Sequence, residues 1–353
     1  GIRLMAYSTI PKGSLYMNPK IYTGTGSSNA ITGVGFQPDW TWIKRRNGTN
    51  GHNLYDVLRG VTKTINSATT AAESTSGSGL TAFGTDGFTV VSDGDVNGSG
   101  GTYVSWNWLA NGTGSANTDG SISSTVSANT TSGFSIVSWT ATNANGATIG
   151  HGLGTTPAIV ITKRLNSTGD WLFGGSLVDT IRGGANSLLL LNTTSAMDNN
   201  SEVYQTFSPT TFQVGVNAGS FANGATLISY CFKDVQGYSK FSSYIGNGNA
   251  DGTFVYTGFK PAFIMIKRTD VAADWEIYDN KRLGFNDNNP PLYANLTNVE
   301  GGNGRIDILS NGFKIRATSG NLGASGGTYI YMAFAENPFV ATSGTNAIPV
   351  TAR

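Results

Sequence analysis

The chain carries the same pattern three times, and this internal repetition constrains its fold more than any other feature. In each copy a proline is followed six residues later by a lysine and then an arginine. The copies are Pro38 with Lys44 and Arg45, Pro157 with Lys163 and Arg164, and Pro261 with Lys267 and Arg268. Self-similarity on this scale is typical of chains built from several copies of one supersecondary unit. The sequence therefore predicts three tandem homologous modules.

Further marks follow in the same order in each copy: a short Asp- or Asn-led string with aromatic residues, an arginine and an asparagine. They are 53–56, Arg59 and Asn66, then 170–173, Arg182 and Asn192, and then 274–279, Arg282 and Asn295. Each copy ends on an alternating string, at 102–108, 226–232 and 328–334, with large side chains on both faces. Such strings are typical of central strands that are buried on both sides.

Shorter alternating strings predict further strands at 40–44, 88–91 and 312–316, and Asp86-Gly87 and Asn311-Gly312 are typical hairpin turns. No 11-residue window keeps a helical period, so helix is expected to be scarce. The predicted fold class is therefore all-β, with three tandem homologous antiparallel β-sandwich modules.

The expected divisions of the chain are an N-terminal segment 1–15, a first module 16–112, a Gly/Ser/Thr linker 113–130, a second module 131–236, a third module 239–337 and a C-terminal tail 338–353. In the linker, Ile122 and Val126 are the large side chains. We expect the linker to be extended and to join the first module loosely, and it could add an edge strand to a neighbouring chain.

Composition limits the chemistry of the chain. Lys and Arg number 22 against 21 Asp and Glu, which disfavours a nucleic-acid-binding surface. One cysteine and two histidines leave no intrachain disulfide and too few ligands for a zinc or iron–sulfur site. The sequence contains no run of about 18 apolar residues, so it predicts no membrane-spanning segment. We therefore expect no cofactor.

Two tryptophans spaced two residues apart, and two that follow the leading Asp of the aromatic strings, are candidate glycan contacts. They are Trp40, Trp42, Trp171 and Trp275. The pair Trp106 and Trp108 has the same spacing. Aromatic rings stack on sugars when they are exposed, whereas the alternative for the paired tryptophans is a place in a sandwich core.

The Lys-Arg pairs and one acidic loop are the other candidates. The pairs could bind an anionic glycan or phosphate, but in an alternating strand Lys44 is expected to face solvent, where it discourages edge pairing. The loop 93–98 resembles the first half of a calcium loop, yet position 104 is Val where a closing Glu is needed. We expect a Gly-rich hairpin there, with no metal at Asp93 and Asp95.

Catalysis is not expected. His52 and His151 lie in glycine-rich turns without a recognisable acid and nucleophile, and no carboxylate pair has a glycosidase context. Cys231 falls in a predicted buried strand and is interpreted as a small apolar residue.

The runs 36–45, 53–60, 69–73 and 83–88 of the first copy resemble a tandem repeat family of unassigned function, found in virion and tail-fibre-like structural proteins of marine tailed phages. The string 326–339 is similar to the typical end of such proteins. The resemblance spans about 20–340 and brings no catalytic or ligand residues with it. In that family the repeats often follow a concanavalin-like domain, which this sequence lacks, and this fits a chain cut upstream of residue 1.

The resemblance implies a phage virion structural protein, a tail fibre or appendage with outward-projecting modules that attaches to the host surface. The expected location is the virion, outside the cell. A trimeric homo-oligomer, other virion proteins and host surface glycans are the expected partners. Two alternatives stay open: a carbohydrate-binding adhesin or lectin module, and a capsid decoration protein.

Overall fold

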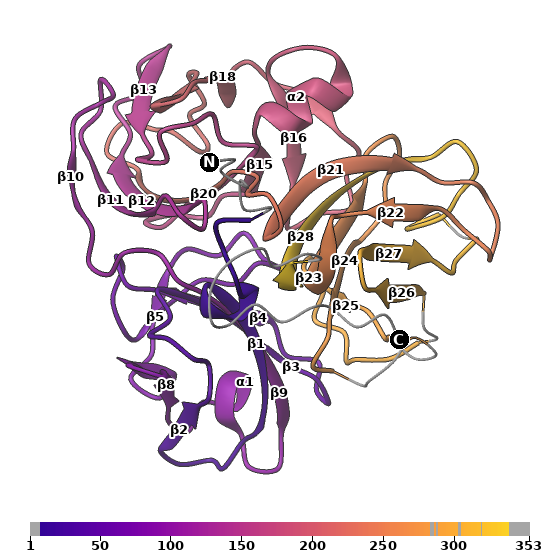
Figure 1. The fold of residues 1–353 in the computed structure, drawn as a ribbon. Coiled ribbons are helices and arrows are strands. Elements are labelled where there is room, and N and C mark those ends of the chain that lie inside the picture. Colours follow the sequence, from indigo (N-terminus) through magenta and orange to yellow (C-terminus); the bar gives the residue numbers. More distant parts are fainter. Residues whose placement is uncertain (1–7, 283–285, 287–288, 303–304, 319, 339–353) are drawn as a thin grey trace, which may run out of the picture.

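The structure is a computed structural model that describes residues 8–282, 286, 289–302, 305–318 and 320–338. These residues form antiparallel β-sheets with little helix, so the all-β prediction is confirmed. The helical elements are a 3-10 turn η1 (Gly13–Leu15) and the short helices α1 (Gly94–Asn97) and α2 (Ser176–Arg182). Figure 1 shows three lobes that follow one another along the sequence around a common centre. We call 16–112, 113–236 and 239–338 the first, second and third segments.

The first segment contains a main sheet, a three-stranded outer sheet and one small ribbon. The main sheet has the order β1 (Met17–Thr23), β9 (Thr102–Trp108), β3 (Trp40–Arg45) and β4 (His52–Asp56). The outer sheet has the order β2 (Asn29–Thr32), β8 (Gly87–Val90) and β7 (Leu80–Gly84). The strands β5 (Lys63–Thr64) and β6 (Ser74–Thr75) pair separately.

The second segment has a main sheet of eight strands. Their order is β10 (Ser115–Asn117), β11 (Ser124–Asn129), β12 (Phe134–Thr140), β20 (Thr226–Phe232), β14 (Ile159–Arg164), β15 (Trp171–Gly174), β16 (Ser187–Leu190) and β17 (Asp198–Asn199). Its outer sheet has the order β13 (Ala147–Gly150), β19 (Thr211–Val214) and β18 (Tyr204–Phe207).

The third segment repeats this plan with fewer strands. Its main sheet has the order β21 (Ser239–Ile245), β28 (Thr328–Pro338), β23 (Phe259–Arg268), β24 (Trp275–Asp279) and β25 (Leu292–Tyr293). Its outer sheet has the order β22 (Phe254–Tyr256), β27 (Gly312–Ile315) and β26 (Ile306–Leu309).

The central strands of the main sheets are β9, β20 and β28, the alternating strings that end each copy. Each pairs on both sides. The second residue after each repeated proline lies opposite the aromatic residue that ends the string. These pairs are Trp40 with Trp108, Ile159 with Phe232, and Phe263 with Phe334. Their side chains are buried on both faces, because one face packs on the outer sheet and the other on the molecular centre.

The segment 113–130 differs from the expected linker. Strand β11 pairs along β12 of its own chain, with Thr125 opposite Ser138, and β10 pairs with β11. Ile122 and Val126 are buried in the core beneath the second outer sheet. The alternation of small and apolar residues therefore forms an edge strand within the chain, and the segment is not a loose connector.

The inner faces of the three main sheets share one apolar core, in which aromatic rings of different segments touch. Trp40 stacks on Tyr230 with ring centroids 4.4 Å apart, and Trp108 meets Phe263 and Phe334 at 5.4 and 5.7 Å. Phe232 lies 5.8 Å from Phe334. The three segments therefore form one body around a common centre and do not stand apart as a string of modules (Figure 1).

Candidate functional site

The four tryptophans named as candidate glycan contacts lie inside the protein. Trp40, Trp42, Trp171 and Trp275 are each at most 2% exposed, and Trp106 and Trp108 are buried as well. A ring stacks on a sugar only if one of its faces is open to solvent. A sugar cannot reach these rings in this structure, so we assign them to the packing between segments.

The three repeated lysines are also buried, which corrects the expectation that Lys44 faces solvent. Lys44, Lys163 and Lys267 have no exposed surface. Each amine donates to carbonyl oxygens of its own turn, namely Arg45 and Gly48 at 2.8 and 3.2 Å, Gly169 at 2.8 Å, and Ala273 at 2.7 Å. A buried ammonium group needs such partners, because an unpaired charge is costly away from water.

Each lysine also binds a loop of a different segment. We call 67–73, 193–197 and 296–300 the docking loops. Lys163 of the second segment donates to the Thr70 carbonyl of the first at 3.0 Å, and Lys267 of the third donates to Thr194 of the second at 2.9 Å. Lys44 of the first donates to Thr297 of the third at 3.2 Å. The contacts run around the molecule and close on themselves.

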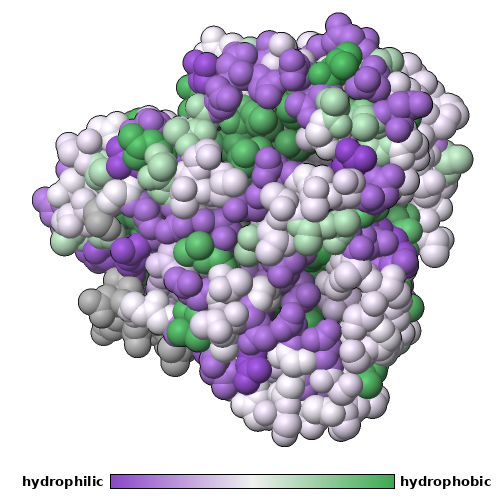
Figure 2. All heavy atoms as spheres, turned by 180° about the vertical axis from the view of Figure 1, so that it is seen from behind, coloured by the Kyte–Doolittle hydropathy of each residue, from purple (hydrophilic) through white to green (hydrophobic). Residues whose placement is uncertain are grey.

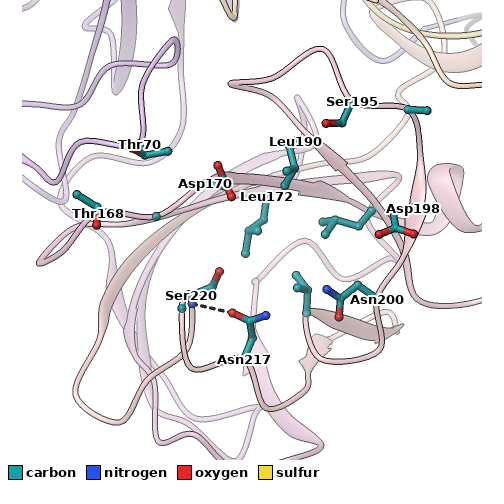
Figure 3. A pocket seen from close by; sticks show the side chains of 15 residues that line it. Thr70, Thr168, Asp170, Leu172, Leu190, Ser195, Asp198, Asn200, Asn217 and Ser220 are labelled. Atoms are coloured by element: carbon teal, nitrogen blue, oxygen red, sulfur yellow. Dashed lines mark hydrogen bonds between the residues drawn. The ribbon is translucent and has the colours of Figure 1, made fainter. Parts of the chain in front are cut away.

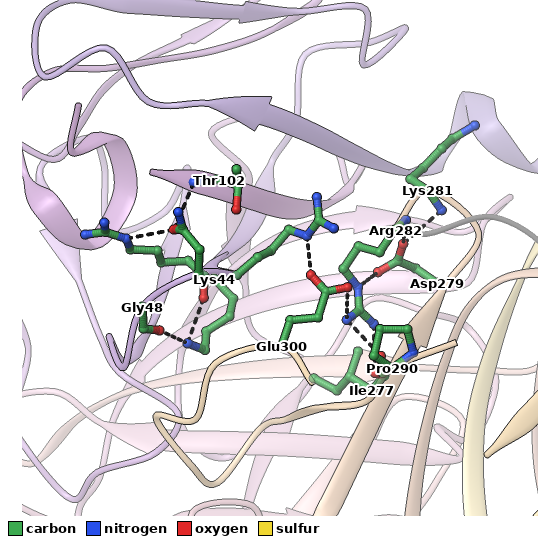
Figure 4. A network of polar contacts seen from close by, with 12 residues as sticks. Lys44, Gly48, Thr102, Ile277, Asp279, Lys281, Arg282, Pro290 and Glu300 are labelled. Atoms are coloured by element: carbon green, nitrogen blue, oxygen red, sulfur yellow. Dashed lines mark hydrogen bonds and ion pairs between the residues drawn. The ribbon is translucent and has the colours of Figure 1, made fainter. Parts of the chain in front are cut away.

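Backbone hydrogen bonds follow the same circuit two residues after each lysine. The amides of Glu73, Met197 and Glu300 donate to the carbonyl oxygens of Leu165, Thr269 and Arg46 at 2.8, 2.8 and 2.7 Å. Arg46 and Glu300 also form an ion pair, and Arg282 lies 3.5 Å from the same carboxylate (Figure 4). The Lys-Arg pattern therefore marks where one segment receives the docking loop of another.

Burial lowers the pKa of Lys44, Lys163 and Lys267 to about 8 in each case. The three amines remain charged at neutral pH and lose the proton more easily than a lysine in water does. The similar environment of the three amines agrees with their similar hydrogen bonds.

The repeated asparagines hold the first residues of β15 and β24 in the second and third segments. Asn192 accepts from the Trp171 amide at 2.8 Å, and Asn295 accepts from the Trp275 amide at 3.0 Å. Their amide groups donate to Asp170 and Asp274. Asn66 instead accepts from the Ala68 amide of its own turn, so this third mark has a different contact.

Two junctions contain a buried ion pair close to the shared core. Arg59 lies 2.5 Å from Asp56, which accepts from the Tyr230 hydroxyl at 2.8 Å. In the same way, Arg282 lies 2.6 Å from Asp279, which accepts from the Trp106 indole at 3.0 Å. Burial by itself raises the pKa of Asp279, but Arg282 and the hydrogen bonds outweigh it and lower that pKa.

The remaining junction has no such pair at these positions. By strand register Gly175 stands where Asp56 and Asp279 stand, and Met332 stands where Trp106 and Tyr230 stand. Arg182 lies exposed at the end of α2. Its match to the buried Arg59 and Arg282, expected from the sequence order, is therefore wrong, because α2 lengthens this turn.

The acidic loop 93–98 forms a helix start. Asp93 accepts from the Asp95 amide at 2.9 Å as the N-cap of α1, and Asp95 accepts from Asn50. Across the described residues no group of three or more His, Cys, Asp or Glu side chains is arranged to hold a metal.

The histidines and the cysteine make packing contacts. The His52 ring accepts from the Trp42 indole at 2.7 Å, and burial lowers the pKa of His52 well below its usual value. His151 contacts the Ser208 carbonyl and the Leu153 amide. Cys231 is buried in β20, and burial raises the pKa of its thiol. The partners of the two histidines are thus an indole and backbone groups.

A hollow of about 460 Å³ lies on the second segment (Figure 3). Its floor is apolar, with Leu172, Leu188 and Leu190 from β15 and β16. Figure 2 shows apolar side chains gathered in a hollow of the upper half of the molecule, where these strands lie. Thr70 of a docking loop contributes to the rim.

The polar rim of this hollow includes Asp170, Asp198, Asn200 and Asn217. Asn217 accepts from the Ser220 amide at 2.8 Å, which fixes its side chain at the rim (Figure 3). None of the fifteen described residues that line the hollow is Lys, Arg or His. Such a site suits an uncharged ligand with several hydroxyl groups better than an anion. Sequence reasoning missed it, because Ser, Thr and Asn in loops are common throughout this chain.

The fold and these contacts define an all-β protein whose three segments are tied around one core. The chain belongs to the family described as a domain of unknown function, DUF7483, whose model matches residues 12–338. No curated protein and no solved structure is significantly similar to the chain. In the described part of the chain, no helix has the length and apolar character needed to cross a membrane.

Proposed function

We propose that the chain is a structural component of a phage virion, a tail fibre or other appendage that contacts the host surface. The observation that carries the proposal is the circuit of three buried lysines, which ties the segments into one body without disulfides. A body held this way keeps its shape outside a cell whatever the redox conditions. The resemblance of its repeats to phage appendage proteins supports the same role.

The proposal includes three homologous β-sandwich modules. Its support is the shared strand order β1-β9-β3-β4, β12-β20-β14-β15 and β21-β28-β23-β24, each with a three-stranded outer sheet. The equivalent lysine contacts support it independently, because a docking loop and its acceptor turn must both be copied to preserve them. The modules are packed around a core, so they form a compact head and not a projecting row.

Immunogold labelling of the phage particles that carry this chain tests the virion role. The expected result is label at the tail or its appendages. Label confined to the head would favour a capsid decoration protein, and particles without label would contradict the proposal. Light scattering of the purified chain tests the proposed homo-oligomer, for which a trimer is expected and a stable monomer at micromolar concentration would count against it.

A second candidate function is carbohydrate binding, and the hollow over β15 and β16 favours it. Its apolar floor and uncharged or acidic rim fit a neutral sugar. Ala196→Trp would fill the hollow, and Ala144→Trp, at an exposed turn, is the matched control. On an array of immobilised neutral bacterial polysaccharides, the native chain and the control should bind and Ala196→Trp should not. Equal binding by all three would exclude this hollow as the site.

A further inference from the structure

In the second segment, one extended run covers the open edges of two sheets. Strand β11 pairs along β12, and a few residues earlier Ile122 forms a parallel bridge with Ile149 of β13. The Ile122 amide donates to the Thr148 carbonyl at 3.0 Å. The run 117–130 therefore covers the edges of the main sheet and the outer sheet together.

In the part of the chain that the structure describes, the corresponding edges of the third segment carry no such covering run. By strand order β21 corresponds to β12, and β22 corresponds to β13. Among the described residues, no strand pairs with the outer side of β21 beyond the bridge of its first residue, Ser239, to Val235. The run that covers the second segment has no counterpart in the chain between the second and third segments, because only two residues separate them.

Three equivalent positions beside these edges differ sharply between segments. By register they are Thr23, Ala30 and Thr32 in the first segment, Thr140, Thr148 and Gly150 in the second, and Ile245, Phe254 and Tyr256 in the third. The last three are 54%, 45% and 56% exposed, more than any other large apolar side chain in the described residues. The framework of the fold does not require these side chains, since the other segments place small residues there.

The first segment has the same open edge but protects it. Its edge strand β1 carries Pro19 and Lys20, and both residue types discourage the addition of a strand. Pro19 stands at the register position of Phe241 in β21. The third segment has Phe241 in place of the proline, so no proline blocks this edge.

Two contacts of β21 show which of its backbone groups point away from the sheet. The Phe241 amide donates to the Asp234 carboxylate at 2.7 Å, and the Ile245 carbonyl accepts from Thr253 at 2.7 Å. Groups of residues two apart point to the same side of a strand. The backbone of Ser243, between them and exposed, therefore points away from the sheet.

We propose that the open edge of β21, together with Ile245, Phe254 and Tyr256, accepts an extended segment of another polypeptide chain as an added strand. The covering run of the second segment indicates its chemistry: Ser- and Thr-rich, low in charge, with two apolar side chains four residues apart, as Ile122 and Val126 are. When a strand is added to a sheet edge, backbone hydrogen bonds supply the affinity and apolar side-chain contacts supply the specificity for the partner sequence. The inference concerns the chain's own surface and does not depend on the virion role.

The probe is a fluorescent peptide with the sequence of residues 117–130, added to the full chain and followed by anisotropy. The native chain should bind it saturably. Ser243→Pro removes an outward amide without touching the ladder to β28, and it should weaken binding by about tenfold or more. The triple variant Ile245→Thr, Phe254→Ala, Tyr256→Thr installs the first-segment residues and should weaken binding similarly. Val216→Thr, an exposed valine of the second segment, should bind as the native chain does.

Two results would overturn the inference. One is no native binding up to about 1 mM peptide, the weak end of specific affinity. The other is undiminished binding by both variants, which would place the peptide elsewhere, for instance in exchange with β11. Circular dichroism of each variant verifies its fold, and a peptide of scrambled order tests whether the spacing of its apolar residues matters.

Discussion

The three junctions between segments resemble one another at their outer parts, which we call the rims and where the docking loops bind. They differ at their inner ends, close to the shared core. At every rim, hydrogen bonds from a buried lysine and from a backbone amide hold a docking loop against another segment. Closer to the centre, two junctions bury an Asp–Arg pair under an aromatic donor, and the third has Gly175 and Met332 at these positions. The junction that lacks the aspartate also lacks the aromatic side chain that donates a hydrogen bond to it. The buried charges and their hydrogen-bond partners are therefore present together or absent together.

This difference separates two kinds of contact. The lysine contacts use backbone carbonyl oxygens, which any loop sequence supplies, so they can be copied three times. The inner ion pairs need three specific side chains from two segments, because a buried charge without its partners is costly. We therefore expect the rim contacts to be similar in strength and the inner contacts to be unequal.

Asp279→Ala should have the largest effect. It leaves the Arg282 charge buried without its closest carboxylate and the Trp106 indole without an acceptor, so the free energy of unfolding should fall by about 3–5 kcal/mol. Urea unfolding measures the change. Asp56→Ala should behave similarly. Asp270→Ala, which breaks an exposed pair with Arg268, should cost about 1 kcal/mol or less, and equal losses at Asp279 and Asp270 would contradict the interpretation.

Lys→Met substitutions at the rim should have intermediate effects. Each leaves at least two carbonyl oxygens unpaired but also removes a desolvated charge, so we expect losses of about 1–3 kcal/mol at Lys44, Lys163 and Lys267 alike. Thermal unfolding of the three variants measures them side by side. Arg164→Met, beside Lys163 but partly exposed, is the matched control. A large loss at one lysine and none at the others would refute the equivalence of the rims.

The pH dependence of stability should show the same lysines with a smaller effect per group. Their pKa of about 8 in the folded chain lies below the ordinary lysine value of 10.5, so between these values the unfolded chain binds more protons. The free energy of unfolding should therefore rise with pH across that window, by at most about 1.4 kcal/mol per lysine and pH unit.

At higher pH the buried tyrosines reverse this trend. Burial raises the pKa of Tyr230 and Tyr278 well above the ordinary tyrosine value of 10.0, so the unfolded chain loses these protons first. Stability should then fall, and its maximum should lie at about pH 9–10. Urea unfolding across this range measures the profile, and the triple Lys→Met variant should lose the rising limb. A native profile that is flat between pH 8 and 10 would exclude lowered lysine pKa values.

Strand positions could be predicted from the sequence because they depend on neighbouring residues. The strings 102–108, 226–232 and 328–334 alternate along the chain and became β9, β20 and β28. The repeated Lys-Arg pair was also visible, since a repeat needs no structural knowledge to be seen.

The burial of Lys44 could not be predicted in this way. Its outer partner, Thr297, lies 253 residues further along the chain, and no local pattern indicates that contact. For Trp40 and Trp42 the sequence left two alternatives open, an exposed glycan contact and a place in a core, and their burial decides for the core. The Ser/Thr-rich run that forms β11 was expected to be a linker that could pair with a neighbouring chain. Its composition does not reveal that its partner is β12 of the same chain.

Closure of the circuit between the third and first segments is the central claim, and a cysteine pair tests it directly. A backbone hydrogen bond and an ion pair join Arg46 and Glu300, although these residues lie 254 positions apart in the sequence. Disulfides form only where the Cα atoms lie within about 7 Å. The Arg46→Cys, Glu300→Cys variant should therefore oxidise within a single chain, as seen by intact mass and by faster migration on a non-reducing gel. Cys231 is buried and should not interfere. Arg46→Cys with Glu202→Cys, on the second segment, should stay reduced under the same conditions. If the first pair also stays reduced, or links only between chains, the segments do not close into one body.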